Sequence, residues 1–387
     1  MNTRLKYFLT VFLRFFLKIF YLFPIKKNRI IFVAFEGKQY SDSPKYIYEE
    51  IKQNDSADAD FQYIWVLNDP KNIYDNIITV PYQSIKFFYY MLTSKIIVNN
   101  QLTINYIPFR KKQTVIGTWH GGGAYKKCQL DVIDNKIERK YTKLISQNVN
   151  WVLSSCQAFS SAFKTAYLLK DDMYINSGLP RNDILINKNK NYLYDKIKSK
   201  YNIPKNDKIA LYAPTFRSAP NMPTASFIAG NFNLDIKRLK NALSKKYSGN
   251  WHVMFRAHPK LSQIKFDSNV IDVSNYKDMQ ELLYVSDVLI NDYSSSMWDF
   301  SFTKKPIFIY AEDLKNYTNN RDFYTPISKW PFSIAKNNDE LERNILEFNQ
   351  EEYNEKLDKH HKDLGSFEKG VASRMISELI FNILERK

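Results

Sequence analysis

The chain has 387 residues, more than one hydrophobic core usually serves, so two packed domains are expected. Hydrophobic residues make up 44% and charged residues 25%, which excludes a disordered or wholly membrane-embedded chain. The net charge of +16 favours an anionic partner, namely nucleic acid, a phospholipid surface or a phosphorylated substrate, although the base composition of a genome also enriches lysine. Two cysteines, Cys128 and Cys156, provide no disulfide framework and fit a reducing compartment.

Residues 4–29, RLKYFLTVFLRFFLKIFYLFPIKKNR, are the most apolar and aromatic part of the chain. No small-residue cleavage site follows them, which disfavours a signal peptide. Their charges leave no uncharged run longer than seven residues, which disfavours a membrane-spanning helix. A basic stripe on an aromatic body is typical of a helix that lies on an anionic leaflet, so residues 1–27 are predicted to be an amphipathic membrane-associating helix, with a domain-packing helix as the alternative. The basic residues of this segment are Arg4, Lys6, Arg14, Lys18, Lys26, Lys27 and Arg29.

From residue 28 onward, β-branched and aromatic runs alternate with helical patterns, which predicts βαβ units and parallel sheets. A first series of strands is expected at RIIFVAF (29–35), FQYIWVL (61–67), KIIVNN (95–100), QTVIG (113–117), WVLSS (151–155) and MYINSG (173–178). A second series is expected at KIALYAPTF (208–216), WHVMFRAHP (251–259), NVIDVS (269–274), DVLIND (287–292) and PIFIY (306–310). The lysine-rich residues 187–208 suit a linker helix. The predicted fold class is α/β, with two Rossmann-like doubly wound domains over residues 28–195 and 196–387 and a cleft between them.

Three consecutive glycines follow a histidine in GTWHGGGAYKK (117–127), although the chain has only 10 glycines. They come directly after a predicted strand, where α/β proteins place ligands, and glycine lets backbone N–H groups approach a bound anion. His-Gly-Gly-Gly is also the oxyanion loop of lipases, but the chain has no G-x-S-x-G elbow and no nucleotide P-loop. His120 remains as a candidate general base at the mouth of a sheet.

The segment DVLINDYSSSMWDFSFTKKPIFIY (287–310) places three serines between an apolar strand and a short helix. A single serine would cap that helix with no ligand bound. A helix N-terminus with additional hydroxyl groups also suits a diphosphate. Ser294, Ser295 and Ser296 are therefore a candidate diphosphate cradle, with helix capping as the alternative.

Two further strand ends carry cationic and hydroxyl side chains. YAPTFR (212–217) provides Thr215 and Arg217, and RAHP (256–259) provides Arg256 and His258. Because open α/β sheets bind ligands at the carboxyl ends of their strands, these groups are expected to meet the serine segment at one crevice. Such a set of donors suits a nucleoside diphosphate.

In order and spacing, WHGGGAYKK, YAPTFR, RAHP and NDYSSSMWDF resemble the CDP-glycerol glycerophosphotransferase family of teichoic-acid synthesis. GKQYSDSPKYIYE (37–49) and SGLPRND (177–183) resemble further segments of this family, so the resemblance covers about residues 30–370. It implies a GT-B arrangement of the two Rossmann-like domains and a peripheral position on the cytoplasmic side of the cell membrane.

The resemblance also implies roles for matching residues. His120 would deprotonate the acceptor hydroxyl, and His258 would stabilise the donor diphosphate. Substrate contacts are expected from Gly121, Gly122, Lys126, Thr215, Arg217, Arg256, Asp292, Ser294, Ser295 and Ser296. Many family members have Gly-Thr-Pro after the histidine, whereas this chain has three glycines there, which leaves the acceptor and the polyol of the donor open.

The expected reaction transfers glycerol phosphate from CDP-glycerol, or ribitol phosphate from CDP-ribitol, to a hydroxyl of a polyprenyl-diphosphate-linked acceptor and releases CMP. No cofactor or metal is expected, because arginine, histidine and serine donors can replace the charge of a metal ion. Asp58 and Asp60 form a D-x-D pattern, but their polar surroundings fit a solvated loop.

Two other functions compete with this one, of which the glycosyltransferase stays open. A GT-B glycosyltransferase that uses a nucleotide-sugar would share the fold and the phosphate-binding features. A nucleic-acid-binding protein would interleave basic and aromatic residues on one module, whereas the lysines here are spread over the chain, so no nucleic-acid partner is expected. Of the remaining histidines, His252 is expected to be structural, and His360 and His361 are expected to be solvated.

Overall fold

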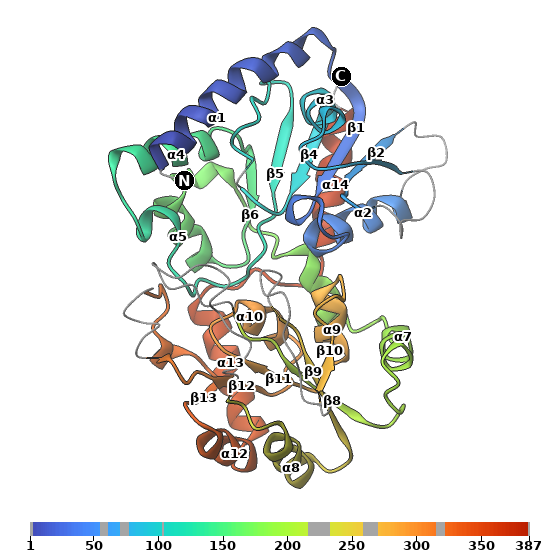
Figure 1. Ribbon diagram of the computed structural model, residues 1–387, viewed down its shortest axis with the longest axis vertical. Helices are drawn as coiled ribbons and strands as arrows, with labels where there is room; N and C mark the ends of the chain where they lie inside the picture. Colours follow the sequence, from blue (N-terminus) through green and yellow to red (C-terminus); the bar gives the residue numbers. More distant parts are fainter. Residues whose placement is uncertain are drawn as a thin grey trace. The chain divides into compact units, whose positions relative to one another are not determined.

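The computed structural model describes residues 3–54, 61–69, 77–102, 104–215, 233–257, 270–314 and 322–385. The chain divides into two compact units (Figure 1). The first comprises Met1–Asp183 together with Leu364–Lys387, and the second comprises Ile184–Asp363. The short helix α6 (Asp183–Asn187) links the two along the chain.

The described part of the first unit contains a seven-stranded sheet in the order β3-β2-β1-β4-β5-β6-β7, in which all paired strands are parallel. The strands are β1 (Lys26–Val33), β2 (Gln62–Val66), β3 (Ile78–Val80), β4 (Ser94–Asn99), β5 (Thr114–Gly117), β6 (Trp151–Leu153) and β7 (Tyr174–Ile175). Strand order reverses between β1 and β4, which makes the carboxyl ends of these two strands the switch point of the sheet.

The central strands of this sheet are buried on both faces, as a parallel sheet between helices requires. Its core includes Ile30, Phe32, Ile96 and Val98, each fully buried. The helices of the unit are α1 (Thr3–Leu17), α2 (Asp42–Asn54), α3 (Ile85–Thr93), α4 (Lys136–Ser146), α5 (Gln157–Ala166) and α14 (Ala372–Glu385).

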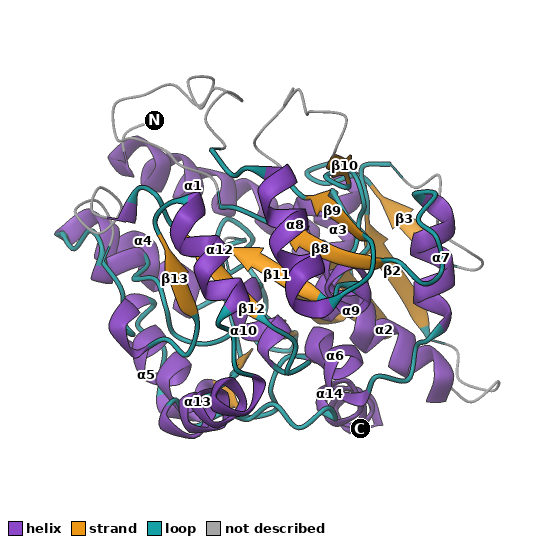
Figure 2. Cartoon of the chain, turned by 90° about the horizontal axis from the view of Figure 1, so that it is seen from below, coloured by secondary structure: helices purple, strands orange, loops and turns teal. Residues whose placement is uncertain are grey.

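Among its described residues, the second unit repeats this plan with a six-stranded parallel sheet in the order β10-β9-β8-β11-β12-β13. Its strands are β8 (Lys208–Tyr212), β9 (Trp251–Phe255), β10 (Val270–Asp272), β11 (Val288–Asn291), β12 (Ile307–Tyr310) and β13 (Ser333–Ala335). The helices are α7 (Tyr192–Lys200), α8 (Ile236–Tyr247), α9 (Met279–Val285), α10 (Ser296–Ser301), α12 (Asn338–Leu346) and α13 (Gln350–Asp363). Figure 2 shows α8 and α12 side by side in front of this sheet, and its switch point lies between β8 and β11.

The N-terminal segment differs in part from its prediction. The helix α1 ends at Leu17, a 3₁₀ turn, η1 (Lys18–Leu22), follows, and Lys26 already belongs to β1. Its basic residues do not share one face. Arg14 donates to the backbone carbonyls of Asn105 and Ile107, and Arg29 is buried.

Apart from Arg4 and Lys6, the exposed side chains of α1 are apolar. Its exposed apolar side chains are Leu5, Phe8, Leu9, Val11, Phe12, Leu13, Phe15 and Phe16. No helix among the described residues is both long and apolar enough to cross a membrane.

The C-terminal residues also depart from the prediction, which assigned all of residues 196–387 to the second domain. The last helix, α14, instead packs against α2 of the first unit (Figure 1). Its Ile376 and Ile380 are fully buried in the core of that unit. Two three-residue strands, β3 and β13, lie outside the predicted series because neither carries a long enough apolar run to stand out.

Candidate active site

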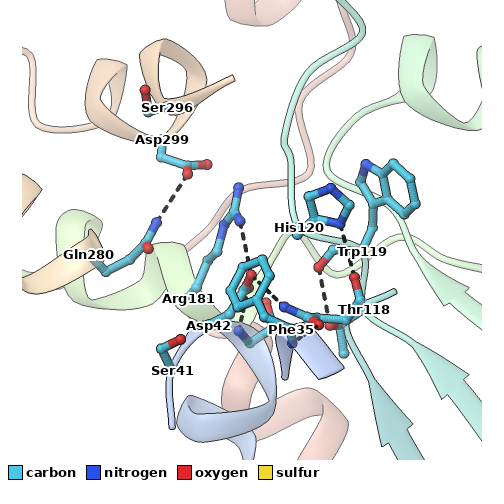
Figure 3. A network of polar contacts seen from close by, with 12 residues as sticks. Phe35, Ser41, Asp42, Thr118, Trp119, His120, Arg181, Gln280, Ser296 and Asp299 are labelled. Carbon is cyan, nitrogen blue, oxygen red and sulfur yellow. Dashed lines mark hydrogen bonds and ion pairs between the residues drawn. The ribbon is translucent and has the colours of Figure 1, made fainter. Parts of the chain in front are cut away.

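His120 lies three residues after β5, at the carboxyl edge of the first sheet. Its Nδ1 is 3.1 Å from the backbone oxygen of Asn100, and its ring packs against Phe35 and Trp119 (Figure 3). Because a carbonyl oxygen can only accept, Nδ1 carries the proton, and the lone pair of the neutral ring lies on Nε2. Burial lowers the pKa of His120 below its usual value, so the neutral form prevails at neutral pH. A neutral imidazole with its lone pair on Nε2 is the form that a general base requires.

The glycine turn after His120 is anchored to the neighbouring strand β6. Gly123 has φ +67°, a left-handed conformation that favours glycine. Its N–H donates to Oγ of Ser155, which follows β6 in the chain, at 3.1 Å. Gly121 and Gly122 are buried in this turn. Of the three glycines, Gly123 is therefore the one whose backbone conformation requires glycine, and it lies where the turn meets the end of β6.

Two side chains of the same segment flank the histidine. Trp119 packs edge-on against Phe163 of α5, with ring centroids 5.0 Å apart. Lys126 is half-buried, and its charge acts to lower the pKa of His120. The segment thus places a cation near the proposed base.

Three residues outside the predicted site connect to His120. Asn100, at the end of β4, uses its side-chain Nδ2 to donate to Oδ2 of Asp42 at 2.9 Å. Arg181 donates to the same carboxylate oxygen at 3.4 Å, and both members of this ion pair are buried (Figure 3). Asp42 and Arg181 belong to the segments 37–49 and 177–183, which the sequence analysis related to the family without assigning a role. Asn100 is the last residue of a predicted strand, at the edge of the sheet where ligands bind. That position is the sequence feature that could have identified it as a site residue.

In the second unit, the structure joins two of the predicted residues. The carboxylate of Asp292, which follows β11, accepts from the backbone N–H of Thr215 at 2.8 Å and from its hydroxyl at 2.9 Å. Asp292 is almost fully buried. The aspartate therefore ties the segment after β8 to the segment after β11, at the switch point of this sheet.

The three serines form a compact turn at the start of α10. Ser295 occupies the N-cap position, but its side chain makes no capping hydrogen bond. The Oγ of Ser294 accepts from the backbone N–H of Ser296 at 3.3 Å and lies 3.0 Å from its hydroxyl. Asn291 donates to the backbone oxygen of Ser294 at 2.9 Å. The hydroxyl of Ser294 therefore takes part in capping α10, whereas the side chain of Ser295 does not.

Arg256 follows β9 and points into its own unit. One of its guanidinium nitrogens donates to the backbone oxygen of Tyr276 at 2.7 Å. Burial lowers the pKa of Arg256, an effect that Asp278 opposes. This arrangement fixes the arginine beside the carboxyl end of β9. The predicted residues Arg217 and His258 lie outside the described residues.

In the described part of the chain, no group of three or more histidine, cysteine, aspartate or glutamate side chains is arranged to hold a metal ion. At the carboxyl ends of the two sheets, the carboxylates of Asp42 and Asp292 accept hydrogen bonds from Arg181 and Thr215, and the other polar groups described above are a histidine, hydroxyls, a lysine and arginines. Such groups bind and neutralise phosphate oxygens through hydrogen bonds and charge.

Comparison with known proteins agrees with this chemistry. Residues 15–382 match the model of the family described as CDP-glycerol:poly(glycerophosphate) glycerophosphotransferase. The chain is 34% identical over 375 residues to the teichoic acid glycerol-phosphate transferase of Staphylococcus aureus, covering 92% of this chain and 93% of that protein. It is 30% identical over 380 residues to the teichoic acid poly(glycerol phosphate) polymerase of Staphylococcus epidermidis, covering 92% of this chain and 51% of that longer protein.

The fold is similar to that of a solved relative. The wall teichoic acid polymerase TagF superposes with a TM-score of 0.82 at 28% identity, covering 99% of this chain and 97% of that one. A variant of the same polymerase soaked with CDPG superposes with a TM-score of 0.81. The predicted pair of GT-B-like parallel-sheet domains is confirmed by this match and by the strand orders. The chain belongs to the CDP-glycerol:poly(glycerophosphate) glycerophosphotransferase family.

Proposed function

We propose that the chain transfers glycerol phosphate from CDP-glycerol to a hydroxyl group of an acceptor and releases CMP, in the synthesis of teichoic acid or a related surface polymer. The observation that carries the proposal is His120, whose proton is held on Nδ1 by a backbone carbonyl and whose Nε2 is the basic atom. The family description specifies glycerol, and so do the names of relatives that are 30% to 34% identical, whereas relatives named for ribitol phosphate are 25% to 29% identical, so CDP-glycerol is favoured over CDP-ribitol.

In this reaction, Nε2 of His120 takes the proton of the acceptor hydroxyl. The oxygen of that hydroxyl attacks the phosphorus of CDP-glycerol that bears the glycerol. A new P–O bond forms, and the bond from that phosphorus to the bridging oxygen breaks, so that CMP leaves with the electron pair. Phosphoryl transfer depends chiefly on positioning and on neutralising charge. The histidine contributes the proton transfer, and the remaining polar groups contribute the neutralisation.

The donor diphosphate would be held by the second unit. Support comes from the turn at Ser294, Ser295 and Ser296 and from the tie between Thr215 and Asp292 at the switch point of the sheet. Arg256 lies at the next strand end. Arg217 and His258 stay in the proposal as phosphate ligands on the strength of their motifs alone.

The acceptor is proposed to be linked to polyprenyl diphosphate, which would place the enzyme at a membrane. The exposed apolar face of α1 supports peripheral binding, since Phe8, Phe12 and Phe15 are each more than 60% exposed. Lys18, Lys26 and Lys27, which follow α1 in the chain, are exposed and would meet anionic lipid. The cytoplasmic side of the cell membrane is the proposed location.

Acceptor-dependent release of CMP tests the proposed activity. The purified chain is given CDP-glycerol or CDP-ribitol with a lipid-linked glycerophosphate acceptor, and CMP is measured for the wild type and for His120→Ala. We expect CMP from CDP-glycerol and a rate lower by about 10²- to 10⁴-fold in the variant, the range of general-base catalysis. His252→Gln, altered at the amino-terminal half of β9, is the matched control.

Release of UDP from nucleotide-sugars, with no CMP from either donor, would instead identify a glycosyltransferase. Near-full turnover by His120→Ala would remove the histidine from the mechanism while leaving the activity itself intact.

A further inference from the structure

The environment of His120 contains a buried polar network that the proposed chemistry does not use directly. Asn100 is fully buried, at the switch point between β1 and β4. Its backbone oxygen faces Nδ1 of His120, so the orientation of this one carbonyl determines how the imidazole is held. The contacts that hold Asn100 in place therefore also determine the orientation of the His120 imidazole.

Asn100 is held by three hydrogen bonds of its own. Its backbone N–H donates to the oxygen of Val33 at 3.2 Å. Its side-chain oxygen accepts from the backbone N–H of Phe35 at 2.9 Å, and its Nδ2 donates to Asp42 at 2.9 Å. Both polar ends of the Asn100 side chain are therefore hydrogen-bonded, and a rotated Asn100 would leave buried polar groups without partners.

Asp42 is itself held in an unusual conformation. Its φ is 62°, in the left-handed region that non-glycine residues seldom adopt, and Phe35 and Glu36 of the same loop also have positive φ. The carboxylate accepts from the backbone N–H of Ser43 at 2.6 Å through one oxygen and from Asn100 and Arg181 through the other. Strain of this kind persists where surrounding contacts over-determine it, and it is common at functional sites.

We propose that Asn100, Asp42 and Arg181 are positioning residues for His120: the Asp42–Arg181 ion pair holds the Asn100 side chain, and the Asn100 carbonyl holds the imidazole with Nε2 as its basic atom. This inference rests on the proposed role of His120. It assigns a function to the segments 37–49 and 177–183, which come from different parts of the chain and meet at one carboxylate.

The same ion pair sets the electrostatic environment of the base. Burial lowers the pKa of His120, the charge of Asp42 acts to raise it, and the charges of Arg181 and Lys126 act to lower it. Removing Asp42 should therefore lower the pKa, and removing Arg181 should raise it. A base works only when it is deprotonated, so the acid limb of the rate profile should follow this pKa.

Rate profiles of three variants test the proposal with CDP-glycerol as donor. In Asp42→Asn, the acid limb of kcat should move to lower pH, and in Arg181→Gln it should move to higher pH. Asn100→Ala should lower kcat by up to about 100-fold with an unchanged KM for CDP-glycerol, because a misplaced base slows chemistry without weakening donor binding. Asp207→Asn, which removes a carboxylate 2.8 Å from His252 in the second unit, should leave the acid limb in place.

Breaking a buried ion pair leaves one charge unpaired and can prevent folding. The double variant Asp42→Asn/Arg181→Gln removes both charges and should place the acid limb between those of the single variants. Acid limbs that stay at the wild-type pH in every folded variant, with wild-type kcat in Asn100→Ala, would overturn the positioning role. A wild-type chain that releases no CMP would contradict the proposed activity itself, which separates the two failures.

Discussion

At the scale of single residues, burial decides the chemical state of several side chains that the sequence leaves ambiguous. His120 could be identified because it follows a strand and precedes glycines. The state of His360 and His361 could not, since their charged neighbours predicted solvated side chains. His360 is instead 5% exposed, and the ring of His361 stacks on Phe302 with centroids 4.4 Å apart. Charged residues nearby in sequence do not show which face of α13 packs inward.

His360, which is buried, and His361, which is half-buried, predict a loss of stability in acid. Burial lowers the pKa of both His360 and His361 to about 4, below the value of about 6.5 for an unfolded histidine. Between these values the unfolded chain binds protons that the folded chain does not, so stability falls as the pH drops from about 6.5 to 4. Urea unfolding at several pH values should show this slope. His361→Phe keeps an aromatic ring against Phe302 and should flatten the slope by up to about 1.4 kcal/mol per pH unit; an unchanged slope would contradict the assignment.

The two cysteines should differ in reactivity. Cys156 is fully buried, its sulfur accepts from the backbone N–H of Phe159 at the start of α5, and burial raises its pKa to about 12. A thiol that stays protonated is a poor nucleophile. A thiol-reactive disulfide reagent at pH 8 should label one cysteine in the native protein, Cys128, and both in denaturant. Cys128→Ala should abolish the native reaction, and two fast-reacting thiols in the folded protein would show that Cys156 is exposed.

At the scale of elements, the sequence patterns located most strands, because each is a short apolar run that ends at a turn. The N-terminal helix was predicted too, but the sequence did not show which of its side chains are exposed and which pack against the protein. The prediction grouped Arg14 with the exposed basic residues, whereas its guanidinium donates to carbonyls of residues 105 and 107 and to the side chain of Asn148. Periodicity shows that residues share a face of a helix, but the partner of that face comes only from tertiary packing.

This arrangement predicts which α1 residues bind a membrane. Phe12 and Phe15 are 63% and 69% exposed, so replacing both with serine should leave the fold intact. Burying a phenylalanine side chain contributes about 1.5 to 3 kcal/mol, so the double variant should bind anionic vesicles at least about 100-fold more weakly in a sedimentation assay. Ile133→Ser, at a residue 59% exposed in the same unit, is the control. Equal vesicle binding by all three proteins would exclude α1 as the lipid-binding element.

At the scale of the whole molecule, the chain does not follow a simple order of one domain and then the next. After completing the second unit, it returns to the first at Leu364, and α14 packs on α2 there. The carboxylate of Asp183 accepts from the backbone N–H groups of Ala372 and Ser373 at the start of α14. Helical periodicity predicts that residues 372–385 form a helix, but it carries no information about which sheet that helix covers, so the prediction kept it with its neighbours in sequence.

The returning helix should therefore stabilise the first unit and not the second. Ile376 is fully buried in the core of the first unit, and Ile376→Ala should cost about 2 to 5 kcal/mol through lost burial and the cavity left behind. Glu378→Ala, at an exposed position of the same helix, should be nearly neutral. Because two units need not unfold together, hydrogen exchange measured segment by segment is the appropriate readout. Exchange in Ile376→Ala should accelerate in β1 and β4 and stay unchanged in β8 and β11, whereas faster exchange confined to the second sheet would mean that α14 belongs to that unit in solution.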